Sequence, residues 1–146
     1  MIAEFLNRLF HPSTTQLPDA DARLALSALL VRIARSDHNY AAVEQDRIDR
    51  ILMARYGLDL GGSALLREEA EALEAEAPDT VRFTRAIKDA VPYEDRQAVV
   101  EAMWQVALAD GQRDDEEDAL LRLAASLLGV NDVDSARARR KVEGNQ

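Results

Sequence analysis

Two segments of the chain follow the same order of features, and this duplication restricts the possible folds more than any other property of the sequence. Each segment has an apolar stretch, an aspartate, a short polar loop, a glutamate and an amphipathic stretch that ends in glycine and an apolar residue. The segments are residues 28–58 and 102–130. Apolar side chains recur at helical spacing on both sides of each loop, which predicts two helix–acidic loop–helix units.

The remaining sequence is expected to complete an all-α bundle of seven to eight helices with an internal pseudo-twofold repeat. Ala, Leu, Arg and Glu dominate the composition and aromatic residues make up only 5%, which favours helices over strands. We predict a single domain, residues 1–146. Its expected parts are an N-terminal helix over 1–10, a loop over 11–18, the repeat-containing core over 19–130, and a C-terminal helix and tail over 131–146.

Local signals predict several element boundaries and surfaces. Gly57 follows an amphipathic stretch and is expected to be a left-handed C-cap. Ser63 follows two glycines and is a candidate N-cap. The charged run over residues 68–76 is predicted to face solvent, and residues 136–146 are predicted to fray.

The charge balance narrows the possible functions. The chain has 27 acidic and 18 basic residues, a net charge of −9, which argues against nucleic-acid binding because that needs basic surface. This charge is compatible with a cation or with a protein partner; an oligomer is possible but not indicated. No apolar run approaches the roughly 20 residues needed to span a bilayer, and the first residues lack the features of a signal peptide. We therefore expect a cytoplasmic protein without a transmembrane segment.

The acids of the two loops form the candidate site. Asp37 corresponds to Asp110 and Glu44 to Glu117, and in each unit the two acids are seven positions apart. A carboxylate at a helix C-terminus is unfavourable by roughly 0.3–1 kcal/mol, so a cation, an arginine or backbone N–H groups should offset the two aspartates. Carboxylates and loop carbonyls are the ligands of Ca²⁺, Mg²⁺ and Mn²⁺. The candidate metal ligands are Asp37, Glu44, Asp110, Asp114 and Glu117.

Helix capping is the competing interpretation of these acids. Asp114 and Glu117 have the spacing of a capping box, which accounts for both without a ligand. Glu44 has no such explanation in the sequence, because Ala41 stands where the capping acid would be. The loops also lack the order of an EF-hand, which needs alternating acids, a central glycine and a glutamate at position twelve.

The stretch ALADGQRDDEEDALLRLAASLLGV resembles the repeated A-D-G-x5-E signature of the TerB family of tellurite resistance proteins. The resemblance extends roughly from Asp21 to Val130. The second unit matches well, whereas the first has His38 in place of the glycine. The resemblance implies a pseudo-symmetric helical bundle, a link to tellurite and related stress responses, and clustered acids that bind metal. Carried over by position, these are Asp37, Glu44, Asp110 and Glu117, with Asp114 as an auxiliary.

No catalytic machinery accompanies these acids. The chain lacks a Ser-His-Asp set, a phosphate loop and a zinc motif, and His11 and His38 are not spaced for a di-metal bundle site. His38 is either a nitrogen ligand or an exposed loop residue. We therefore expect a non-enzymatic domain that binds a divalent cation or a protein partner through its acidic loops. The alternative is a protein-interaction scaffold whose acids only cap helices.

Overall fold

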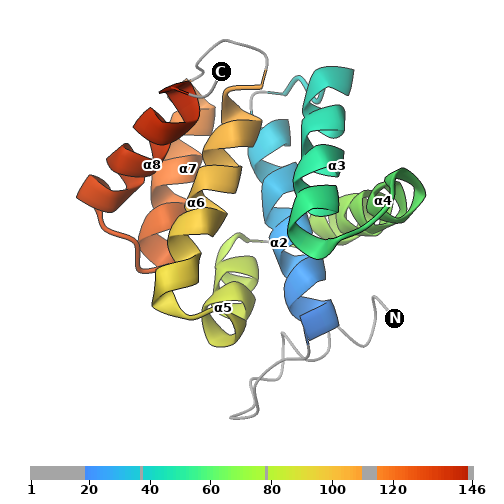
Figure 1. The fold of residues 1–146 in the computed structure, drawn as a ribbon, viewed down its shortest axis with the longest axis horizontal. Coiled ribbons are helices and arrows are strands. Elements are labelled where there is room, and N and C mark those ends of the chain that lie inside the picture. Colours follow the sequence, from blue (N-terminus) through green and yellow to red (C-terminus); the bar gives the residue numbers. More distant parts are fainter. Residues whose placement is uncertain (1–18, 37, 78, 110–114, 145–146) are drawn as a thin grey trace.

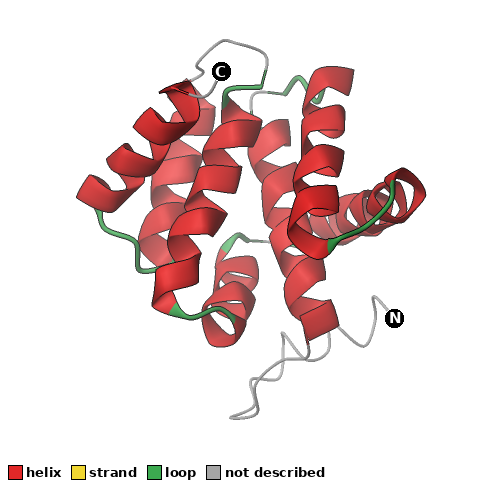
Figure 2. Ribbon diagram, viewed as in Figure 1, coloured by secondary structure: helices red, strands yellow, loops and turns green. Residues whose placement is uncertain are grey.

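A computed structural model describes residues 19–36, 38–77, 79–109 and 115–144 of the chain (Figure 1). These residues form seven helices and no strand, which confirms the all-α class (Figure 2). The helix expected over 1–10 and the loop over 11–18 lie outside the described residues. The helices are α2 (Asp19–Arg35), α3 (Ala42–Tyr56), α4 (Leu60–Glu76), α5 (Val81–Ala90), α6 (Tyr93–Ala107), α7 (Asp115–Leu127) and α8 (Asp132–Gly144).

Helix α2 is the centre of the bundle. It contacts α3, α4 and α5 as well as α6 and α7, and in Figure 1 it lies between α3 and the group formed by α6, α7 and α8. From Leu24 to Ala34 nearly every side chain is buried, because this stretch is apolar on most of its circumference. Met103 and Trp104 of α6 are also buried, as their spacing indicates. None of the described helices is long and apolar enough to cross a membrane.

The C-terminal segment is more ordered than the sequence indicated. We expected fraying over 136–146, but α8 continues to Gly144. Ser135, Ala138 and Val142 are buried at helical spacing, and α8 packs against α6. Lys141 donates a hydrogen bond to Glu101 over 3.2 Å. The expectation of fraying was wrong for residues 136–144, because three small or apolar side chains suffice to bury one side of an otherwise charged helix; residues 145–146 lie outside the described residues.

The predicted end of α3 at Gly57 is confirmed, whereas the predicted start of α4 at Ser63 is wrong. Gly57 is a left-handed C-cap with φ 64°. Helix α4 begins earlier than expected, because the Asp59 carboxylate accepts a hydrogen bond from the Gly62 N–H over 2.7 Å and so caps the helix. Ser63 is buried inside α4, where its hydroxyl donates to the Leu60 carbonyl.

The glutamate-rich run of α4 does not face solvent along its whole length. Glu71 and Glu74 turn inward, where Glu74 forms ion pairs with Arg32 and Arg35 of α2, and Glu71 pairs with Arg67. The prediction of a solvated run was wrong for these two glutamates, because arginines of α2 and α4 lie within the interface and need carboxylate partners there. Ion pairs, together with apolar contacts, therefore hold α4 on the bundle.

Candidate functional site

Two buried glutamates lie at the same end of the bundle. Glu44 is in the first turn of α3 and is 1% exposed, and Glu117 is in the first turn of α7 and is 2% exposed. Both helices begin at the upper end of the molecule in Figure 1. A buried carboxylate is costly unless hydrogen bonds or opposite charge compensate it. A negative charge at either of these two positions therefore depends on the groups that surround it.

Glu44 has a capping role that the sequence did not reveal. Its carboxylate accepts a hydrogen bond from the Ala41 backbone N–H over 3.2 Å, and its own N–H donates to the Ala41 carbonyl over 3.0 Å. The inference that Ala41 removes the capping explanation was wrong, because this half of a capping box uses only the backbone of the capping residue. Capping thus accounts for one oxygen of Glu44.

The His38 imidazole and the Glu116 carboxylate link the loop between α2 and α3 to the first turn of α7. His38 Nε2 lies 3.4 Å from Glu116 Oε2, and both side chains are exposed. This contact joins the loop between α2 and α3 to the start of α7. The two residues are far apart in the chain, and neither belongs to a pattern that would have predicted their contact.

The backbone of His38 explains why glycine suits this position. His38 has φ 63°, and it is the only described residue other than glycine with positive φ. L-amino acids with a Cβ rarely adopt this left-handed conformation. In the second unit the corresponding residue is Gly111. The His38 side chain is exposed, as one of its two interpretations expected, and its role as a nitrogen ligand stays a prediction.

A glycine at position 38 should therefore stabilise the loop. We expect His38→Gly to be about 0.5–1 kcal/mol more stable than His38→Ala, because both variants lose the imidazole but only glycine adopts positive φ without strain. Urea denaturation of the two variants measures this difference. Equal stability would contradict the assignment of strain to His38.

The described residues contain only part of the predicted ligand set. Glu44 and Glu117 are present, whereas Asp37, Asp110 and Asp114 lie outside the described residues. Within the described ranges, no group of three or more His, Asp or Glu side chains has an arrangement that could hold a metal ion. The structure thus brings the first turns of α3 and α7 to one end and leaves the contribution of the aspartates as a prediction.

Comparison with known proteins gives one match. The family model for tellurite resistance protein TerB matches residues 23–140, which is most of the chain and includes both acidic loops. No curated protein and no solved structure matches the chain.

Proposed function

Since this chain belongs to the TerB family of tellurite resistance proteins, we propose that it is a non-enzymatic domain whose paired acidic loops bind a divalent cation. The observation that carries the proposal is the burial of Glu44 and Glu117 at one end of the bundle. Buried carboxylates at matched positions have an energetic reason to take up a cation. We place the domain in a cytoplasmic response to metal or tellurite stress.

The proposed ligands are oxygen atoms from both loops. Glu44 and Glu117 would supply one carboxylate each, and Asp37, Asp110 and Asp114 would complete the set. The contact between His38 and Glu116 supports a single shared site, because it keeps the loop between α2 and α3 next to the first turn of α7. An all-carboxylate set favours Ca²⁺, Mg²⁺ or Mn²⁺, whereas a nitrogen from His38 would shift the preference toward a transition metal.

A protein-interaction scaffold is the second candidate function. It is favoured by the hydrogen bond between the Ala41 N–H and Glu44, because that bond gives the carboxylate a structural role without an ion. In this alternative the acids only cap helices, and the partner would contact the acidic end of the bundle.

Calorimetric titration of the metal-free chain distinguishes the two functions. Titrated in turn with Ca²⁺, Mg²⁺, Mn²⁺ and Zn²⁺, it should give saturable heat with at least one ion. Replacing Asp37 and Asp110 together by asparagine should weaken that binding about 10–100-fold. Asp46→Asn is the matched control, because it removes an exposed acid whose partner is Arg50 of the same helix.

Two results would overturn the cation proposal. One is the absence of heat with every ion at millimolar concentration. The other is equal affinity of the double variant and the Asp46→Asn control for the bound ion. Either result would leave the scaffold as the better account of the acidic loops.

A further inference from the structure

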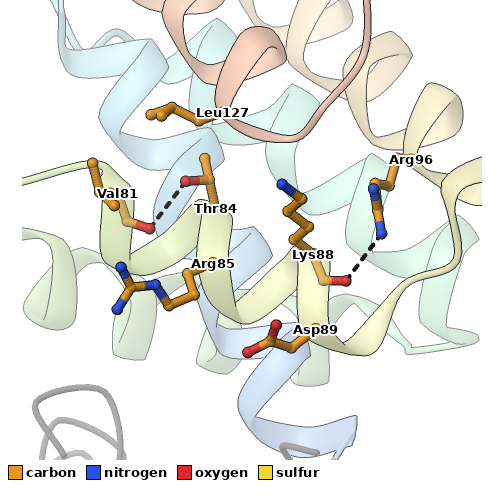
Figure 3. Close-up of a pocket in the computed structure, with 7 residues that line it drawn as sticks. All are labelled: Val81, Thr84, Arg85, Lys88, Asp89, Arg96 and Leu127. Carbon is orange, nitrogen blue, oxygen red and sulfur yellow. Dashed lines mark hydrogen bonds between the residues drawn. The ribbon is translucent and has the colours of Figure 1, made fainter. Parts of the chain in front are cut away.

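A concave site lined mainly by basic side chains lies among α5, the first turn of α6 and the end of α7 (Figure 3). Its cavity volume is about 590 Å³, which is within the roughly 300–1,000 Å³ of small-molecule sites. In Figure 1 the start of α6 lies at the lower end of the molecule, whereas α3 begins at the upper end. The polar lining consists of Arg85, Lys88, Arg96, Asp89 and Thr84, and the apolar lining of Val81 and Leu127.

Three cations and one carboxylate line this pocket, although the chain as a whole carries a charge of −9. Arg85 and Lys88 are exposed, and neither forms an ion pair with another residue in the described ranges. In Figure 3 the Lys88 side chain extends between Thr84 and Arg96, whereas Asp89 points away from it. Lys88 and Asp89, which both line the pocket, therefore form no ion pair with each other.

Arg96 is held rigidly at the edge of the pocket. Its Nε donates to the Val91 carbonyl over 3.0 Å, Nη2 to the Lys88 carbonyl over 3.2 Å, and Nη1 to the Leu128 carbonyl over 3.3 Å. These carbonyls lie at the ends of α5 and α7, where the helix dipoles would otherwise repel an anion. Since a guanidinium has five N–H groups, three bonds leave two for a ligand.

A glycine leaves room beside both cations. A Cβ added at Gly129 would lie 3.5 Å from Arg96 Nη1 and 3.9 Å from Lys88 Cε. The Lys88 side chain, from α5, and the Arg96 guanidinium, from α6, thus both pass close to Gly129. A guanidinium held by three carbonyls, with a lysine side chain beside it in the same pocket, suits the binding of an anionic group.

We propose that this pocket binds a soluble phosphate monoester. Its phosphoryl group would lie between Lys88 and Arg96, with Arg85 at the rim, and its organic part would contact Val81 and Leu127. A phosphoryl group fits because it accepts hydrogen bonds on several oxygens and carries up to two charges, matching an ammonium beside a guanidinium. A small ligand is favoured over an acidic peptide, because the polar groups converge in one concavity and do not extend along a groove.

Titration with two phosphates tests this proposal. Inorganic phosphate and phenyl phosphate are added to the full chain at constant ionic strength, and binding is followed by NMR chemical shifts. Both should saturate, and phenyl phosphate should bind several-fold more tightly because its ring covers Val81 and Leu127. Lys88→Gln should weaken binding about tenfold and Arg85→Gln about threefold, as expected for the loss of one charged contact.

Arg140→Gln is the matched control, because Arg140 is exposed on α8 and does not line the pocket. Its affinity for phenyl phosphate should equal that of the unmodified chain. Lack of saturation with both phosphates would overturn the proposal, as would an equal loss in Arg140→Gln and Lys88→Gln. Binding to phosphatidylglycerol vesicles or to an acidic peptide, without binding of phenyl phosphate, would also overturn it and assign the basic surface to that partner.

Discussion

Replacing Arg67 by methionine should lower the free energy of unfolding by about 3 kcal/mol, because it leaves two mostly buried carboxylates without their shared cation. Arg67 Nε donates to Asp49 Oδ1 over 2.7 Å, and Nη1 donates to Glu71 Oε2 over 3.0 Å. The side chains of Arg67, Asp49 and Glu71 are 14%, 11% and 21% exposed. Solvent screens the charges of this cluster weakly. The loss of unfolding free energy should therefore be several times that caused by removing a surface ion pair.

Two further variants separate the effect of charge from that of packing. Adding Asp49→Asn and Glu71→Gln to Arg67→Met should restore most of the stability, because no uncompensated charge remains. Arg50→Met is the matched control: Arg50 pairs with Asp46 over 2.9 Å, but both side chains are mostly exposed. Its cost should stay below about 1 kcal/mol. Urea denaturation measures all three, and similar costs for Arg67→Met and Arg50→Met would contradict the importance of the buried cluster.

The same cluster reaches the loop that carries the candidate site. The Tyr40 hydroxyl donates to Glu71 Oε2 over 2.6 Å. Burial, followed by the hydrogen bond to Glu71, raises the pKa of Tyr40 far above its ordinary value, so the hydroxyl keeps its proton over the whole physiological range. Tyr40 thus fixes the end of the loop between α2 and α3 to α4. Because Tyr40 is bonded to Glu71, the ion pairs of α4 help to position the loop that contains His38. They also help to position Glu44, which follows Tyr40 by four residues.

The helices could be predicted from sequence because their signals are local. Apolar side chains at helical spacing define α2, α3, α6 and α7, and Gly57 ends α3 as expected. The inward turn of Glu74 could not be predicted, because it depends on Arg32 and Arg35 of another helix. Arg67 lies four residues before Glu71 in α4, but its spacing does not reveal that this pair lies within an interface. A run of glutamates has the same composition whether it faces solvent or arginines in an interface. The burial of one side of α8 likewise depends on α6.

The candidate site was predictable only in part, for the same reason. The matched spacing of aspartate and glutamate selected Glu44 and Glu117, and both occupy first turns at one end of the bundle. Their nearly complete burial was not predicted, because neighbouring helices produce it. The contact between His38 and Glu116 had no sequence signal, since it joins residues from different units. The internal repeat itself stays a prediction.

If the acidic loops bind the proposed cation, replacing Glu44 and Glu117 together by glutamine should abolish the stabilisation of the chain by that ion. For the unmodified protein this stabilisation is expected to be about 2.7 kcal/mol when the ion is present at a hundred times its Kd. Glutamine keeps an oxygen that can accept the hydrogen bond from the Ala41 N–H, so the cap of α3 survives while the charge is lost. Urea denaturation with and without the ion measures the difference.

The metal-free protein provides the decisive comparison between a cation site and helix caps. If the acids form a site, neutralising two buried carboxylates near the loop aspartates removes repulsion, and the variant should be at least as stable as the unmodified chain without ions. If the acids only cap helices, both proteins should respond equally to the ion.

Glu94→Gln with Asp95→Asn is the matched control, because it removes two exposed acids from the first turn of α6 and should leave the stabilisation by the ion intact. Full stabilisation by the ion in the Glu44 and Glu117 variant would contradict the cation site, since these two buried carboxylates are proposed as ligands of the ion.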